Sequence, residues 1–338
     1  MRQAMTAMVL AAVLGTWAGA AFGQVSVDGL VEPLEYGDPL AVQTAPTGFG
    51  DNVSELNALY AKLLPSGELA MGLTGNLEAN GNGIVVFLDL RPGGAVETVL
   101  AGGYGRIGSV GGQWVDDWGT DTDGSDGVSP TPGGGSILDP GFDPDIAIEV
   151  NTNDWDLGDG HHYFVNIIDL TYPNDDNLPN KDIYLGSNLL DGPAVTQDYF
   201  RDEGATWAGT VTHAFSNANA DGVWGWDFDN PPGELGDPLS AALGLELLMS
   251  PEFLDIEPGH VAKALAFITN ANGDWLSNQF LPGLGLAENP GGPGDPGGVP
   301  LFDAGVYPGD QFVIVPEPGT LGMIALGAAG LLARRRRR

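Results

Sequence analysis

Three aspartates on one short loop are the first candidates for chemistry in this chain. Asp121, Asp123 and Asp126 share the stretch 121–127 with two glycines. Carboxylates on a tight loop suit calcium, a hard cation that takes about six to eight oxygen ligands. Such turns also form without a metal, because aspartate side chains hydrogen-bond to their own backbone. Calcium is therefore the one cofactor that the sequence suggests, with a plain turn as the alternative.

A second loop has the spacing of the first half of an EF-hand calcium loop. Asn217, Asn219 and Asp221 occupy alternate positions and are followed by a glycine. The twelfth position, which closes the motif with a glutamate, is Phe228 in this chain. The loop is thus an incomplete calcium site, and a turn held by its own side chains is the alternative.

Two tryptophans separated by one glycine predict a carbohydrate contact. In an extended chain, Trp224 and Trp226 project from the same face. Asp227 and Asp229 follow them, so planar carboxylates would lie beside flat apolar rings. This combination suits a pyranose, whose CH face stacks on an indole while its hydroxyls form hydrogen bonds. The alternative is that the tryptophans fill the core, as large apolar residues usually do.

Known catalytic patterns are missing from the sequence. No Gly-x-Ser-x-Gly turn, no His-Glu-x-x-His pair and no cysteine occurs, so serine, zinc-peptidase and thiol chemistry lack support. The four histidines are His161, His162, His213 and His260. Acidic residues are abundant, but nothing singles out a glycosidase pair among them. We therefore predict that the protein is not an enzyme.

Short apolar runs separated by glycine, aspartate, asparagine and proline predict an all-β fold. The expected architecture is an antiparallel β-sandwich with long Gly-, Pro- and Asp-rich loops, followed by a short C-terminal hydrophobic helix. Residues 84–88 are apolar throughout, which indicates a strand covered on both faces. The predicted strands are residues 24–27, 41–44, 84–90, 146–150, 163–170, 209–215, 242–248, 261–269 and 311–315.

The N-terminus carries a targeting segment. Residues 1–23 combine Arg2, an apolar stretch and small residues before an expected cut after Gly23. This pattern predicts a secretory signal peptide, and hence the Sec translocon as a partner. Residues 24–314 are then expected to form the ectodomain.

The tail, residues 315–338, has three parts. Pro316, Glu317 and Pro318 form the predicted sorting and cleavage motif, in which the two prolines hold the backbone extended. Residues 319–333 form a predicted transmembrane segment of about fifteen residues, shorter than the ~20 that usually span a bilayer. The predicted cytoplasmic anchor consists of Arg334, Arg335, Arg336, Arg337 and Arg338.

This tail resembles the PEP-CTERM sorting signal of bacterial surface proteins. The resemblance implies that exosortase, a membrane protease, recognises the Pro-Glu-Pro segment and cuts near it. The membrane anchor would then be transient, and the protein would move to the cell surface or extracellular matrix. A permanent C-terminal anchor without processing is the alternative.

Charge limits the class of partner. The full chain has a formal net charge of −33. Loss of Arg2 and the five terminal arginines leaves six of the 12 basic residues, and loss of Glu317 leaves 44 of the 45 acidic ones, a net charge of about −38. Such a surface repels nucleic acid and attracts cations, so nucleic-acid binding is excluded.

The body of the chain carries two further resemblances. Residues 27–37, 48–52, 73–78 and 276–282 resemble the ectodomains of many PEP-CTERM surface proteins. The opening third, with Val-Asp-Gly at 27–29, is also similar to family 9 carbohydrate-binding modules and related DOMON-like β-sandwiches. The second resemblance implies an antiparallel sandwich with a ligand groove formed by a sheet and its loops.

Residues 54–64 allow two interpretations. Residue propensities and a serine N-cap favour a helix. The Pro-Ser-Gly that follows can instead close a β-hairpin, and the resemblance to β-sandwiches makes the hairpin our prediction. A short helix is expected at residues 250–254, with Ser250 as its cap and Pro251 at its first position.

Together these features predict a secreted or cell-surface protein that is not catalytic. Exosortase would sort it to the bacterial envelope or extracellular matrix, where it would associate with exopolysaccharide. The alternatives are a calcium-dependent adhesive or structural surface protein and a polysaccharide-active enzyme.

Overall fold

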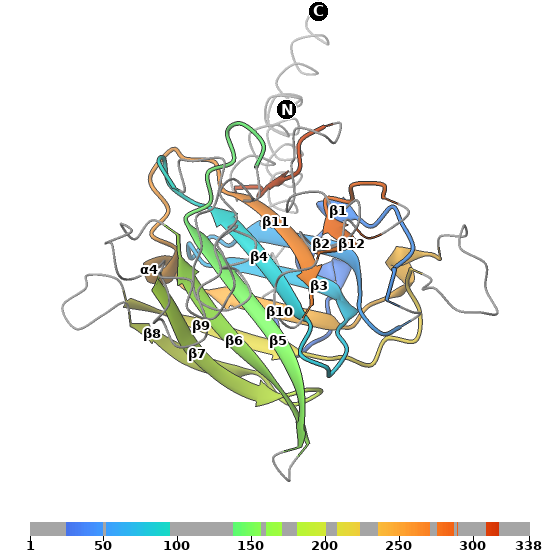
Figure 1. The fold of residues 1–338 in the computed structure, drawn as a ribbon. Coiled ribbons are helices and arrows are strands. Elements are labelled where there is room, and N and C mark those ends of the chain that lie inside the picture. The colour runs from blue at the N-terminus through green and yellow to red at the C-terminus, as the bar shows by residue number, and fades with distance from the viewer. Residues whose placement is uncertain are drawn as a thin grey trace, which may run out of the picture.

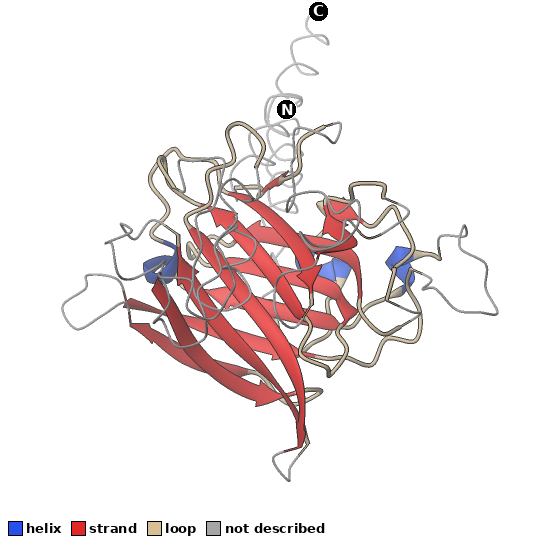
Figure 2. Cartoon of the chain, in the orientation of Figure 1, coloured by secondary structure: helices blue, strands red, loops and turns tan. Residues whose placement is uncertain are grey.

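The chain forms two packed sheets in the computed structural model (Figures 1 and 2). The structure describes residues 25–49, 52–94, 138–156, 160–170, 181–200, 208–223, 236–270, 276–286, 289 and 309–317. Strands dominate these residues, and the helices among them are short turns: α2 (Pro33–Tyr36), η1 (Pro238–Ser240) and α4 (Pro251–Leu254). The prediction of an all-β antiparallel sandwich is confirmed.

Each sheet is antiparallel along its whole strand order. The first sheet runs β1 (Ala41–Val42), β2 (Glu55–Leu63), β3 (Leu69–Asn76), β10 (Gly244–Met249), β9 (Ala208–Phe215) and β8 (Val195–Phe200). The second sheet runs β12 (Leu276–Leu281), β11 (Lys263–Thr269), β4 (Gly83–Asp89), β5 (Ile146–Asp156), β6 (His161–Asp169) and β7 (Lys181–Leu189). A short strand, β13 (Val313–Ile314), also pairs with β11.

Strand β4 shows how the second sheet is packed on both faces. Ile84, Val86 and Leu88 point into the core between the sheets. Val85 and Phe87 alternate with them and lie in a separate apolar cluster on the outer face. Other buried members of this outer cluster include Leu138, Phe142, Leu265, Phe267 and Phe280. The predicted cover on both faces of this strand is confirmed.

The N-terminal segment covers the outer face of the first sheet. Val25, Val31 and Tyr36 pack there against residues of β2 and β3. The predicted strand at residues 24–27 is wrong, because residues 25–27 form no strand. The backbone N–H of Ser26 donates instead to the Glu35 carboxylate at 2.7 Å.

Two local predictions are confirmed. Residues 54–64 contribute β2, which pairs with β3 as a hairpin closed by residues 64–68. Helix α4 begins after Ser250, whose hydroxyl accepts a hydrogen bond from the backbone N–H of Phe253 at 3.3 Å. Strands β7, β8 and β12 were not among the predicted strands.

The predicted signal peptide, residues 1–23, lies outside the described residues, as does the part of the predicted sorting signal at residues 318–338, which holds Pro318, the apolar segment and the five arginines. Within the part of the chain that the structure describes, no helix is long and apolar enough to cross a membrane.

Candidate functional site at the docked C-terminal segment

The residues predicted to contact a carbohydrate, and those of the first calcium candidate loop, lie outside the described part of the chain. The carbohydrate candidates Trp224, Trp226, Asp227 and Asp229 lie outside the described residues. The calcium candidates Asp121, Asp123 and Asp126 lie outside them as well. Both sets therefore remain predictions.

The loop with EF-hand spacing is described, and its amides bind the protein's own backbone. Asn217 accepts from the N–H of Leu77 at 2.6 Å and donates to the same residue's carbonyl at 2.8 Å. Asn219 does the same with Leu243, at 3.0 and 2.7 Å. Among the described residues, no group of three or more acidic or histidine side chains could hold a metal ion. We interpret this loop as a structural turn that ties β9 to β3 and β10.

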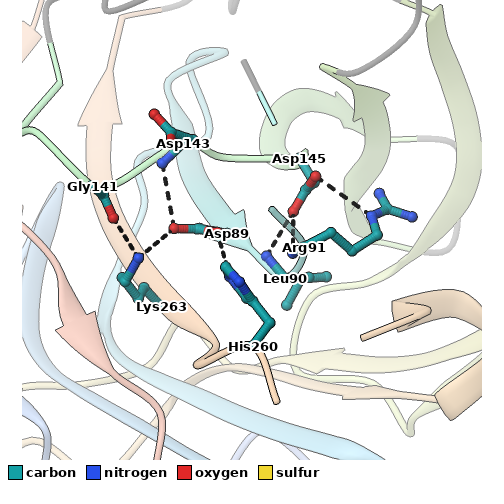
Figure 3. Close-up of polar contacts among 8 residues, drawn as sticks. All are labelled: Asp89, Leu90, Arg91, Gly141, Asp143, Asp145, His260 and Lys263. Atoms are coloured by element: carbon teal, nitrogen blue, oxygen red, sulfur yellow. Dashed lines mark hydrogen bonds and ion pairs between the residues drawn. The ribbon is translucent and has the colours of Figure 1, made fainter. Parts of the chain in front are cut away.

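A cluster of charged side chains lies where β4 ends (Figure 3). Asp89 is 1 % exposed, and its carboxylate accepts a hydrogen bond from the ammonium of Lys263 at 2.7 Å. The other carboxylate oxygen lies 2.7 Å from Nε2 of His260. The ammonium of Lys263 also donates to the carbonyl of Gly141, and the N–H of Asp143 donates to Asp89 at 3.3 Å. We call Asp89, His260 and Lys263 the Asp89 cluster.

The register of the second sheet creates this cluster. Asp89 and Lys263 are directly opposite each other on β4 and β11. Opposite charges at such a cross-strand position stabilise the pairing. The Lys263 ammonium thus neutralises a carboxylate whose charge burial would otherwise penalise.

A second buried carboxylate closes the turn after β4. Asp145 accepts hydrogen bonds from the N–H groups of Leu90 and Arg91 at 2.7 and 2.8 Å. The Arg91 guanidinium lies 3.4 Å from the same carboxylate and 3.4 Å from that of Asp255. Burial raises the pKa of Asp145, against the opposing effect of these donors. These contacts give Asp145 a structural role.

The C-terminal segment docks beside the Asp89 cluster. The ring of Phe312 stacks on Phe142 with centroids 5.4 Å apart, and the Lys263 ammonium lies 5.4 Å from the Phe312 centroid. Val313 and Ile314 then pair with β11 opposite Ala264 and Lys263. Lys263 therefore connects the docked chain to the Asp89 cluster.

The docking continues past β13. The N–H of Val315 donates to the carbonyl of Ala262 at 2.8 Å, and the Val315 side chain is 1 % exposed within the core between the sheets. The carbonyl of Pro316 accepts from the N–H of Leu63, in the first sheet, at 3.4 Å. Glu317 is exposed. We call residues 311–316 the docked segment.

A buried histidine lies elsewhere in the sandwich. His213 of β9 is 0 % exposed, and its Nδ1 lies 2.7 Å from the hydroxyl of Tyr163 on β6. This contact joins the two sheets. Burial lowers the pKa of His213 to about 4 and raises that of Tyr163. His213 lies in the strand predicted at residues 209–215, and the structure places its side chain in the core.

A third buried carboxylate holds the N-terminal segment on the first sheet. Glu246 of β10 is 0 % exposed and accepts from the N–H groups of Asp28 and Gly29, each at 2.7 Å. The hydroxyl of Tyr36 donates to it at 2.8 Å. Burial raises the pKa of Glu246, and these donors compensate in part.

A comparison with protein families identifies the region into which the docked segment leads. Residues 315–338 match the family described as PEP-CTERM protein-sorting motif. This chain carries an exosortase sorting signal at its C-terminus. No curated protein matches the chain, and no solved structure matches it.

The sorting signal explains the tail of the chain. It implies export and a transient membrane anchor before release to the surface. The first residue of the matched region is Val315, which is also the last buried residue in the part of the chain that the structure describes. The folded domain and the signal therefore meet without an intervening linker.

Sequence reasoning did not single out the residues that hold this junction. Asp89, Lys263 and Phe312 come from distant parts of the chain, and their contact depends on the register of β4 and β11. The available signal was that the predicted strands at residues 84–90 and 261–269 each hold one charged residue near an end. Their opposite signs fit a cross-strand pair.

Proposed function

We propose that this chain is a non-catalytic surface protein that the Sec translocon exports and exosortase releases, and that associates with exopolysaccharide outside the cell. The observation that carries the proposal is the sorting motif at residues 315–338, which begins where the folded domain ends. Exosortase is the processing partner, and the bacterial surface or extracellular matrix is the proposed destination.

The state of the buried acids supports a non-catalytic role. Catalytic carboxylates need free access to substrate or water. Asp89, Asp145 and Glu246 are instead buried and hydrogen-bonded to lysine, arginine, tyrosine or backbone groups. These three carboxylates accept hydrogen bonds that hold segments of the fold together.

Association with exopolysaccharide rests on the tryptophan pair and on the resemblance to carbohydrate-binding sandwiches. Trp224, the first tryptophan of the pair, directly follows Val223, whose N–H donates to the buried Asn57 side chain at 2.6 Å. The chain is therefore fixed to the first sheet immediately before the pair. A chain that is already fixed next to its binding residues loses less conformational entropy when those residues bind a sugar.

The test is a glycan array that includes the host's own exopolysaccharide. The protein should comprise residues 24–317, because Val315 is part of the core. Binding that is lost in Trp224→Ala/Trp226→Ala supports the proposal, and a Trp→Ala change elsewhere serves as the control. No binding to any glycan removes the carbohydrate proposal and leaves the sorting signal unaffected.

A calcium-dependent adhesive or structural protein is the second candidate. It is favoured by the net charge of about −38 after processing and by the Asp121, Asp123 and Asp126 loop. Thermal unfolding with calcium and with a chelator tests this candidate. An unchanged melting temperature counts against it, whereas a calcium-dependent rise that disappears in Asp123→Ala/Asp126→Ala supports it.

A further inference from the structure

In the folded protein, the docked segment pairs with the domain directly beside the motif that exosortase is expected to bind. Of the three motif residues, Pro316 is half-buried and hydrogen-bonded, and Glu317 is exposed. The residue before them, Val315, is buried and bonded to Ala262. A protease that approaches the motif therefore meets a chain that is already paired with the domain.

Proteases and other peptide-binding proteins commonly take their target as an extended strand, using its backbone N–H and C=O groups. Here, those groups upstream of Glu317 are shared with β11 and with Leu63. The apolar segment expected to enter the membrane begins at residue 319, so little chain is available on the other side. The motif offers too few free residues on its N-terminal side to fill a binding cleft.

We propose that the docked segment is a latch, which must leave β11 before exosortase can cut and which returns to β11 afterwards. The proposal rests on the exosortase processing described above and adds a conformational step to it. The folded domain would thereby control when its own sorting signal becomes accessible.

The position of β13 makes such opening feasible. Strand β13 has two residues and lies on the edge of β11 that β12 occupies further along. When β13 leaves, β11 keeps its full pairing with β4 and its pairing with β12. Lys263 keeps its ion pair with Asp89. Opening is therefore a local event that leaves both sheets assembled.

The apolar side chains of the segment explain why it returns. With the latch open, Val313 and Val315 leave the core and the end of β11 becomes an unpaired edge. Exposed edges and apolar residues favour aggregation, so closure protects the released protein. Closure requires that the mature protein keeps Val315, which places the cut on its C-terminal side.

A disulfide that holds the latch closed provides the test. Ala264 and Val313 are direct partners on β11 and β13, and facing residues of antiparallel strands have Cα atoms about 4.5–5.5 Å apart, within disulfide range. The chain has no cysteine, so Ala264→Cys/Val313→Cys would create a single bridge. The matched control is Ala266→Cys/Leu281→Cys, which links partners on β11 and β12 and leaves β13 free.

Full-length precursors of both variants are followed by pulse-chase labelling in the native host. The locked latch is expected to slow conversion to the mature form by about tenfold or more, because local opening is prevented. A reductant should restore processing, and the control bridge should leave it unchanged. A locked protein that is processed as fast as its control overturns the latch.

A third variant tests the opposite state. Val313→Asp lies outside the matched signal and places a charge in the core, so it should keep the latch open. Processing at the wild-type rate or faster is expected, and slower processing contradicts the latch. If the wild-type precursor is never shortened, the exosortase proposal itself fails, which is a different result from normal cleavage of the locked variant.

Discussion

Protonation of His213 provides a quantitative test of the sandwich core. The imidazole is 0 % exposed between the sheets, and its pKa is lowered to about 4. In the unfolded chain, the pKa of histidine is about 6.5. Between these values the unfolded state binds a proton that the folded state does not. The contribution of His213 to stability is therefore complete above about pH 6.5 and is lost as the pH falls towards 4.

The size of the effect follows from the two pKa values. Each pKa unit corresponds to about 1.4 kcal/mol, so the full shift amounts to about 3 kcal/mol. At pH 5, the unfolded histidine is almost fully protonated and the folded one is mostly neutral. The expected loss between pH 7.5 and pH 5 is about 2 kcal/mol.

The assay is urea unfolding of wild type and His213→Asn at both pH values. Asparagine keeps a polar atom for the Tyr163 hydroxyl but does not titrate. Its smaller size changes stability by an amount that is independent of pH, and the titration of surface carboxylates is common to both proteins. The difference in unfolding free energy should thus shift by about 2 kcal/mol in favour of the variant at pH 5. Parallel losses in both proteins would refute a neutral buried His213.

Three further substitutions test the contacts described above. Lys263→Met leaves the buried Asp89 carboxylate short of a charge partner, and should lower the free energy of unfolding by about 2–3 kcal/mol in chemical denaturation. Asn219→Ala removes both hydrogen bonds to Leu243 and should cost about 1–3 kcal/mol, equally with calcium and with chelator. Because burial raises the pKa of Glu246, wild type should lose stability relative to Glu246→Gln as the pH rises from about 4, measured by thermal unfolding.

Each of these substitutions has a control. The double variant Asp89→Asn/Lys263→Met should lose less than the sum of its single changes, and additive losses would argue against the ion pair. The exposed Asp221→Ala should have little effect, in contrast to Asn219→Ala, and a calcium-dependent difference between them would restore the calcium interpretation of that loop. Identical pH profiles for wild type and Glu246→Gln would contradict a buried Glu246.

Local patterns in the sequence predicted the elements whose stability is local. The Ser250 cap acts on neighbouring residues, and the structure contains the helix that it predicts. At residues 54–64 local propensity favoured a helix, and the hairpin that the structure contains was predicted from the resemblance to β-sandwiches. The continuous apolar run at residues 84–88 predicted cover on both faces because each face removes its side chains from water.

Features that depend on distant contacts were missed. Strand β7 reads Lys-Asp-Ile-Tyr-Leu-Gly-Ser-Asn-Leu and contains Gly186 at φ +152°, which packs against Gln197 of β8. Its Tyr184 side chain is 58 % exposed, so the strand lacks a clear apolar alternation. The pairing of Asp89 with Lys263 joins residues 174 positions apart, and only the register of β4 and β11 brings them together.

The most direct test of the central claim is the intact mass of the mature protein from its native host, compared with an exosortase-deficient strain. The account predicts a wild-type chain that begins at Gln24 and ends after Val315 but before the apolar segment at residue 319. The deficient strain should retain the tail through Arg338. A protein that ends at Arg338 in both strains would contradict processing at the sorting motif.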